Sequence, residues 1–148
     1  MEAGAGERRR LLARLPTPNE PLPARLSVDD VRALAEDPTV TIGGHGWSHR
    51  MLAAMDGEAR FTDVRESVRL IERLTGRRPT TFAYPFGGEG TYSSVTVRDL
   101  SGLGIGIACT TEGVAVSPGS DPLRLPRLVV GDWDPAELEK QIEEVLRA

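Results

Sequence analysis

Two histidines, His45 and His49, are the only ones in this chain of 148 residues, and they stand four positions apart. They lie in the segment His45-Gly46-Trp47-Ser48-His49, directly after the apolar run 39–42 and two glycines. If the backbone makes one turn between them, both imidazoles project the same way. A catalytic zinc ion typically takes three protein ligands and a water. The pattern therefore predicts a divalent-metal site, completed by a carboxylate from elsewhere in the fold. Two surface histidines without a metal are the alternative.

A second segment of chemical interest reads Phe82-Ala83-Tyr84-Pro85-Phe86-Gly87, in which an apolar strand ends at proline and glycine. A turn of this kind presents backbone N–H groups, which can stabilise an oxyanion in acyl transfer. Its aromatic rings can stack on a sugar. The alternative is a strand-ending turn whose two aromatic rings belong to the core.

A third segment reads Asp132-Trp133-Asp134 and follows the last apolar run of the chain. Asp132 can orient a catalytic group, and Trp133 can offer a platform for a sugar. Asp134 precedes Pro135, and we expect it to cap a helix, because aspartate is a favoured N-cap residue. Asp132 and Trp133 are therefore weaker candidates for the site.

Strand-like and helix-like segments alternate along the chain, which predicts an α/β fold with a mainly parallel sheet. We expect residues 1–26 to hold a helix and a proline-rich linker, and residues 27–148 to form the domain. In such folds, sites gather where the strands end. Four strand ends are therefore expected to line one pocket. The predicted strands are 39–42, 80–84, 105–110 and 125–130, and the predicted helices are 7–15, one starting at Ser27, 62–75, 93–103 and 135–146.

Composition excludes several classes of protein. The net charge of −4 and the pI of about 5.3 give no basic face, so we expect no nucleic-acid partner. The arginine run 8–10 is interpreted as a solvated helix face. A single cysteine, Cys109, excludes an internal disulfide. No stretch approaches the roughly 20 apolar residues of a membrane span. No signal peptide is recognised, so the chain as given is expected in the cytoplasm, or outside the cell if it comes from a longer precursor.

These segments resemble the polysaccharide deacetylases, a carbohydrate-esterase family that includes chitooligosaccharide deacetylases. The segment from Ile42 to Leu52 resembles the family's second motif, in which both histidines bind the metal. The segment from Thr81 to Gly87 resembles the third motif, which lines the pocket and supplies an oxyanion-hole amide. The segments 107–111 and 123–127 are similar in order and spacing. The resemblance covers the family's C-terminal half only.

The resemblance implies a partial or distorted (β/α) barrel that lacks its first strands. It also implies hydrolysis of a non-peptide C–N bond, the N-acetyl group of an amino-sugar polymer or oligosaccharide, with a divalent metal, most readily zinc. His45 and His49 are the implied metal ligands. We assign the oxyanion amide to Tyr84 and substrate contacts to Phe86 and Trp133, with Asp132 as a weaker catalytic candidate.

Two departures from the family leave the activity open. The first motif, an adjacent Asp pair after the first barrel strand, does not precede His45, because Asp29-Asp30 falls at a helix start. No later histidine can serve as the acid. We therefore expect a metal-dependent hydrolase, complete or as a fragment, with a non-catalytic sugar-binding or interaction module on the same fold as the alternative. An incomplete barrel leaves open sheet edges, which favour pairing with a second copy.

Overall fold

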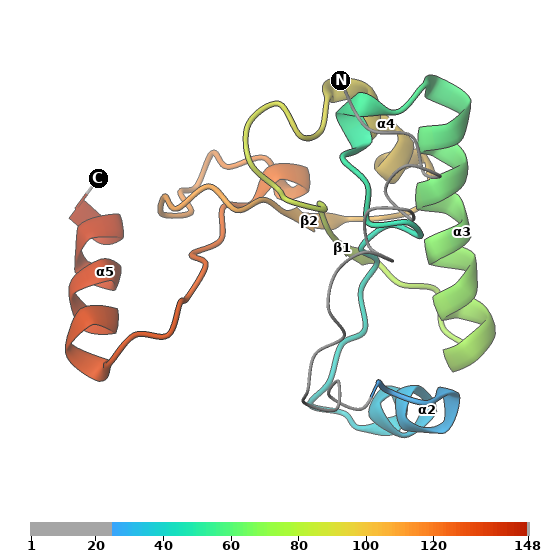
Figure 1. Ribbon diagram of the computed structural model, residues 1–148, viewed down its shortest axis with the longest axis horizontal. Coiled ribbons are helices and arrows are strands. Elements are labelled where there is room, and N and C mark those ends of the chain that lie inside the picture. Colours follow the sequence, from blue (N-terminus) through green and yellow to red (C-terminus); the bar gives the residue numbers. More distant parts are fainter. Residues whose placement is uncertain (1–24, 148) are drawn as a thin grey trace, which may run out of the picture.

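The computed structural model describes residues 25–147 (Figure 1). The predicted helix 7–15, the arginine run and the prolines of the linker lie outside these residues. The described elements alternate between helix and strand from α3 to β2, as the sequence predicted, whereas no strand separates α2 from α3. In chain order they are α2 (Val28–Glu36), the 3-10 helix η1 (Leu52–Ala54), α3 (Gly57–Thr75), β1 (Thr81–Ala83), α4 (Ser94–Gly102), β2 (Ile107–Cys109), the 3-10 helix η2 (Pro122–Arg124) and α5 (Pro135–Arg147).

The sheet is parallel and small. Strands β1 and β2 pair in parallel, with Phe82 opposite Ala108. A single parallel pairing at Gly44 extends the sheet beyond β1, and another at Leu125 extends it beyond β2. Four chain segments therefore run side by side in the same direction, which confirms the predicted parallel α/β arrangement.

The two outer strands are much shorter than predicted. Residues 39–42 form no strand, and the segment 125–130 pairs only at Leu125. At Gly44 the N–H donates to the Thr81 carbonyl (2.9 Å), and the Gly44 carbonyl accepts from the Ala83 N–H (2.8 Å). Among residues 25–147 each outer segment has a strand partner on one side only. The ladder stops because no second strand holds the rest of these segments extended.

Helix α3 is the longest element, with 19 residues, and it begins five residues before the predicted start at Thr62. The Asp56 side chain caps it by accepting the Ala59 N–H (2.9 Å). The helix ends where expected, at Gly76, whose φ of 69° is the left-handed conformation that suits glycine. The early start was missed because Asp-Gly is typical of a turn.

The core lies between the strands and the helices α3 and α4. Figure 1 shows both helices beside the sheet. Nine apolar residues are buried together in this core, which are Leu52, Val64, Val68, Phe82, Tyr84, Leu100, Leu103, Ile105 and Ala108. An ion pair between Arg60 of α3 and Asp99 of α4 (3.0 Å) adds a polar link between the two helices.

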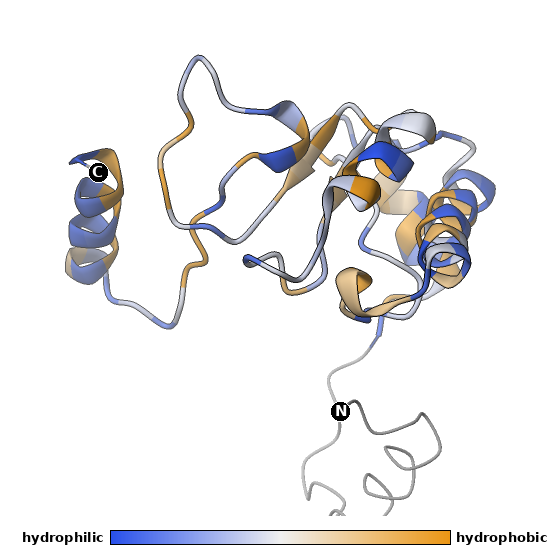
Figure 2. Ribbon diagram, turned by 90° about the horizontal axis from the view of Figure 1, so that it is seen from above, coloured by the Kyte–Doolittle hydropathy of each residue, from blue (hydrophilic) through white to orange (hydrophobic). Residues whose placement is uncertain are grey.

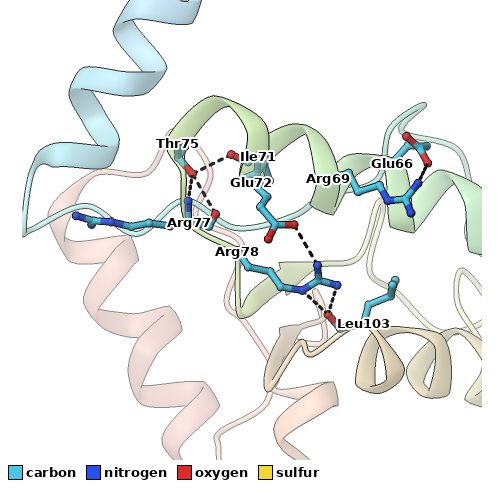
Figure 3. A network of polar contacts seen from close by, with 8 residues as sticks. All are labelled: Glu66, Arg69, Ile71, Glu72, Thr75, Arg77, Arg78 and Leu103. Atoms are coloured by element: carbon cyan, nitrogen blue, oxygen red, sulfur yellow. Dashed lines mark hydrogen bonds and ion pairs between the residues drawn. The ribbon is translucent and has the colours of Figure 1, made fainter.

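A polar network fixes the end of α3 near the start of the strands (Figure 3). The Arg78 guanidinium donates twice to the Leu103 carbonyl (3.1 and 2.9 Å) and once to Glu72 (3.1 Å). Leu103 follows α4, so Arg78 joins the ends of two helices. The network lies where the chain enters β1, whereas His45 lies where the neighbouring segment leaves the sheet. The two histidines and this polar network therefore lie at opposite ends of the strands.

Helix α5 matches the predicted segment but stands apart from the other elements (Figures 1 and 2). Asp134 caps it by accepting the Glu137 N–H (2.9 Å), which confirms the predicted N-cap. No residue of α5 is buried, although its turns carry both polar and apolar residues (Figure 2). Its predicted apolar stripe is therefore not buried in the described chain: Leu138 and Val145 are partly exposed and Ile142 is exposed. None of the helices within residues 25–147 combines the length and apolar content of a membrane span.

Candidate metal and substrate site

The C-terminal ends of three parallel segments lie side by side at one end of the sheet. His45 follows the pairing at Gly44, Tyr84 follows β1, and Thr110 follows β2. The turn after β1 is tied to the end of β2, because the Thr111 hydroxyl donates to the Phe86 carbonyl (2.8 Å) and the Thr111 N–H donates to the Gly87 carbonyl (2.9 Å). The sequence predicted four strand ends at this place, and the fourth is not among them, because the segment 125–130 pairs only at Leu125.

His45 is oriented by the backbone of β1. Its Nδ1 lies 2.7 Å from the Ala83 carbonyl oxygen. A carbonyl oxygen only accepts, so Nδ1 carries the proton and donates it in this contact. The Nε2 of a neutral ring is then left with its lone pair. Metal-ligating histidines commonly donate their other ring N–H to a carbonyl or carboxylate in this way. His45 therefore has the ring orientation and tautomer that metal binding through Nε2 would require.

The His49 ring stands beside the His45 ring. Their centroids are 4.8 Å apart and the rings are nearly perpendicular, at 73°. Two imidazoles bound to one tetrahedral zinc ion through Zn–N bonds of about 2.0–2.1 Å have centroids about 5 Å apart. The other neighbour of His49 is the Phe86 ring, with a centroid distance of 5.2 Å. The separation of the two histidine rings fits a shared ion.

The loop between the histidines has an unusual backbone. Gly46 has φ 77° and His49 has φ 52°, both in the left-handed region. A non-glycine residue is uncommon there, although histidine is enriched several-fold. The carboxylate of Asp63 accepts the backbone N–H groups of Trp47 (2.9 Å) and Ser48 (3.0 Å). Sequence reasoning missed Asp63, because a single aspartate in a helix gives no signal of a contact with a loop 15 residues earlier.

Tyr84 donates two hydrogen bonds, one from its side-chain hydroxyl and one from its backbone N–H. Its side chain is fully buried, and its hydroxyl donates to the Leu123 carbonyl (2.7 Å). Burial raises the pKa of its hydroxyl well above the ordinary value of 10.0, and the nearby Tyr92 adds to the shift. The Tyr84 N–H donates to the Cys109 carbonyl (3.1 Å). That hydrogen bond occupies the donor that the sequence assigned to an oxyanion.

Phe86 presents a different donor at the same turn. Its backbone has φ 65°, and its side chain is 56% exposed. Within residues 25–147 the Phe86 N–H has no hydrogen-bond acceptor. Its ring lies beside His49, as described above. An exposed ring therefore adjoins His49, and the residue that carries it has a free backbone amide. The sequence predicted Phe86 as a substrate contact and Tyr84 as the source of the oxyanion amide.

Asp132 and Trp133 are not brought to the histidines. In the described part of the chain, no hydrogen bond, ion pair or ring contact joins either residue to His45 or His49. Both precede α5, which stands apart from the sheet (Figure 1). Trp47 is an aromatic residue that the sequence did not single out, and its side chain is 58% exposed between the two histidines.

The described residues bring two potential metal ligands together, His45 and His49. No group of three or more histidine, cysteine, aspartate or glutamate side chains within residues 25–147 is placed to hold a metal ion. Asp30 does not supply a third ligand, because its carboxylate accepts both the N–H and the hydroxyl of Ser27 (2.7 Å each) in the N-terminal cap of α2. The expectation that Asp29-Asp30 marks a helix start is confirmed.

Comparison with solved structures identifies the fold. A Streptococcus pyogenes deacetylase, PplD, in complex with acetate, aligns with 80% of this chain and 51% of its own, at a TM-score of 0.69 and 18% identity. A polysaccharide deacetylase from Bacillus cereus aligns with 93% of this chain and 47% of its own, at a TM-score of 0.67 and 15% identity. The fold is therefore a partial (β/α) barrel of the deacetylase type, as predicted.

Sequence comparison identifies the family. The model of the polysaccharide deacetylase family matches residues 18–107, which is more than half of the chain. The peptidoglycan-N-acetylmuramic acid deacetylase PdaC of Bacillus subtilis (strain 168) is 32% identical over 47 residues, which are 32% of this chain and 10% of PdaC. The chain belongs to the polysaccharide deacetylase family. It spans about half the length of the two solved structures described above, and a tenth of PdaC.

Proposed function

We propose that this chain carries the histidine half of a divalent-metal centre that removes N-acetyl groups from amino sugars in a polymer or oligosaccharide, with zinc as the expected ion. One observation carries the proposal. The His45 and His49 rings lie 4.8 Å apart at the strand ends, with His45 Nδ1 held by a backbone carbonyl. Family membership supports the reaction class, since polysaccharide deacetylases remove acetyl groups by hydrolysis.

The donor chemistry fits a borderline metal ion. His45 and His49 each contribute an imidazole nitrogen, and imidazole suits zinc well. A bound divalent ion would polarise the acetyl carbonyl and lower the pKa of a water. In this proposal the chain holds the two imidazole rings where both can bind one ion, and it keeps His45 in the Nδ1–H tautomer.

The neighbouring groups suit an acetylated sugar. The free Phe86 N–H is the amide that we assign to the developing oxyanion, in place of the Tyr84 amide, because hydrogen-bond donors aimed at developing charge are effective only when unoccupied. The exposed rings of Phe86 and Trp47 offer apolar faces for the sugar. Tyr84 supports the site through its ring, which is buried in the core. Asp132 and Trp133 take no role in this proposal.

The reaction also needs a carboxylate as general base, and the described residues group no third potential metal ligand with the two histidines. A general base takes the proton of the attacking water. We propose that this base and the third ligand come from a segment that pairs with an open sheet edge, at Gly44 or at Leu125. A second copy of the chain is one source of such a segment and would make the protein a homo-oligomer. Light scattering coupled to size-exclusion chromatography measures that state.

A second candidate function is a non-catalytic sugar-binding or interaction module. The specific observation in its favour is that the described residues place only two potential ligands together. Such a module would keep the exposed rings and lose turnover. It predicts that N-acetylated oligosaccharides bind whether or not a metal is present.

An acetate-release assay separates these functions. N-acetylglucosamine oligomers are incubated with the protein and added Zn²⁺ or Co²⁺, with and without a chelator. The hydrolase predicts acetate release that is lost with the chelator and in the His45→Ala/His49→Ala variant. The matched control is Ser67→Ala, a buried residue whose hydroxyl bonds only within α3. Sugar binding without acetate release identifies the module, and the absence of both metal and sugar binding contradicts both proposals.

A further inference from the structure

Asp63 connects the core helix α3 to the loop that carries both histidines. Asp63 is only 6% exposed, and its two carboxylate oxygens accept hydrogen bonds from different backbone N–H groups. Oδ1 accepts the Trp47 N–H at 2.9 Å and Oδ2 accepts the Ser48 N–H at 3.0 Å. These are two consecutive amides between His45 and His49. A carboxylate is well suited to this task, because both of its oxygens are acceptors.

The loop has a backbone that needs support. Its two left-handed residues, Gly46 and His49, lie on either side of the amides that Asp63 binds. Residues in sparsely populated backbone regions persist when the surrounding structure determines them. Asp63 is also in close contact with the loop, since a Cβ added to Gly46 would lie 2.9 Å from its Oδ1. The carboxylate and the glycine therefore fit each other.

The contact reaches the ligand pair through the backbone. His45 is held on one side by the Ala83 carbonyl, whereas no side-chain hydrogen bond is found for the His49 ring within residues 25–147. The place of His49 thus depends on the path of the chain from Gly46 to Ser48. Asp63 binds the last two residues before it. The backbone that leads to His49 is therefore held by a carboxylate that binds its amide groups rather than the His49 ring.

We propose that Asp63 is a positioning residue that sets His49 against His45 for metal binding. The proposal rests on the function proposed above, because it assigns a role in the same metal site. A purely structural role for Asp63, as a buried polar group of α3, is the alternative. The two differ in whether the geometry of the imidazole pair changes while the core of the protein stays folded.

The test uses Asp63→Asn, which keeps the shape of the side chain. An amide retains one acceptor oxygen but turns an NH₂ group toward the second backbone N–H, so one of the two hydrogen bonds is replaced by a donor–donor contact. Ser67→Ala is the matched control, because Ser67 is equally buried one turn along α3 and its hydroxyl bonds only to the Val64 carbonyl. Near-UV circular dichroism reports whether each variant keeps its core.

The first readout needs no metal. With only two histidines in the chain, the nuclear Overhauser contact between their imidazole protons is assigned without ambiguity. We expect this contact in the wild type and in Ser67→Ala, and its loss in Asp63→Asn together with faster hydrogen exchange of the Trp47 and Ser48 amides. A folded Asp63→Asn variant that keeps the wild-type contact and exchange rates overturns the proposal.

The second readout is the affinity for Zn²⁺ alone, measured by calorimetric titration. Loss of a group that orients a ligand commonly weakens metal binding about 10–100-fold. We expect a loss of that size in Asp63→Asn and none in Ser67→Ala. If the wild type binds no Zn²⁺, the proposed function fails, whereas the imidazole contact still decides the role of Asp63.

A second variant keeps the proposal testable if Asp63→Asn does not fold. Asp63→Glu retains the charge and both acceptors but lengthens the side chain by one methylene. We expect it to fold, to protect both amides in part, and to bind Zn²⁺ with an affinity between those of the wild type and the His49→Ala variant. If Asp63→Glu loses the contact between the imidazole protons but binds Zn²⁺ as tightly as the wild type, the position of His49 does not matter for metal binding, and the proposal fails.

Discussion

The Nδ1 of His45 lies 2.7 Å from the carbonyl oxygen of Ala83, across 38 positions of sequence. This contact joins the histidine loop to the end of β1 and determines which ring nitrogen carries the proton. Because the acceptor is a backbone atom, the small side chain of Ala83 does not weaken it. The arrangement leaves the other ring nitrogen, Nε2, without this contact at the strand ends, whatever the residue type at position 83.

The first prediction follows from this contact. The neutral His45 ring is expected to be the Nδ1–H tautomer in the metal-free protein, because the Ala83 carbonyl only accepts. The ¹⁵N shifts of the imidazole, recorded by long-range ¹H–¹⁵N correlation, measure this directly. A neutral His45 that is protonated at Nε2 would mean that the contact does not form in solution.

The second prediction compares two glycines with similar backbone angles. Gly76 (φ 69°) has open space around it, whereas Gly46 (φ 77°) faces Asp63. Substituting alanine at Gly76 should lower the free energy of unfolding by about 1–2 kcal/mol, the cost of a left-handed non-glycine residue. Gly46→Ala carries the same backbone cost and adds crowding of about 1–3 kcal/mol. Urea denaturation of both variants measures the difference, and equal losses would contradict the close fit of Gly46 to Asp63.

The sequence predicted the parts of the site that lie within one short segment. The spacing of His45 and His49 and the turn after β1 are local, so residue types alone located both. The early start of α3 escaped because the Asp-Gly pair at residues 56–57 is typical of a turn, whereas Asp56 caps the helix.

The contacts that need the third dimension could not be predicted. Asp63 binds amides that precede it by 15 and 16 positions, and the Tyr84 amide is taken by Cys109, 25 positions later. Neither contact follows from residue types. The outer strands were overestimated for a related reason: β-branched residues in the run 125–130 favour extended backbone, but a strand forms only where a partner donates and accepts hydrogen bonds.

The third prediction concerns the ion pair that joins α3 to α4. The side chains of Arg60 and Asp99 keep only 12% and 18% of their exposure, so removing one leaves a poorly solvated charge. Arg60→Ala or Asp99→Ala should destabilise the protein by somewhat less than the about 3–5 kcal/mol typical of a fully buried pair. The double variant should lose less than the sum of the two. A double-mutant cycle by thermal or urea unfolding measures the coupling, expected at about 0.5–3 kcal/mol, and strictly additive losses would exclude a direct interaction.

The fourth prediction is a pH dependence that arises from Tyr84. Its pKa in the folded chain is raised above the ordinary value of 10.0, first by burial and then by Tyr92. The unfolded chain therefore loses this proton at a lower pH than the folded chain does. Stability from this group is fully present below pH 10 and falls as the pH rises above that value.

Tyr84→Phe provides the control for this pH dependence. It removes the ionisable hydroxyl together with the hydrogen bond to Leu123, so it should lower stability at neutral pH by about 0.5–1.5 kcal/mol and flatten the alkaline decline. Tyr92 retains a smaller contribution, because burial also raises its pKa. Urea unfolding between pH 7 and 11 measures both effects. An unchanged alkaline slope in Tyr84→Phe would assign the decline to other groups.

The fifth prediction tests the shared metal site itself, by titration of the chain with Zn²⁺ while the ¹⁵N imidazole resonances are observed. Only two histidines contribute signals. If His45 and His49 bind one ion, both rings shift together at the same Zn²⁺ concentration, the His45 change falls on Nε2, and His45→Ala removes the response of His49. Rings that respond independently, or do not respond at all, would contradict a shared metal site.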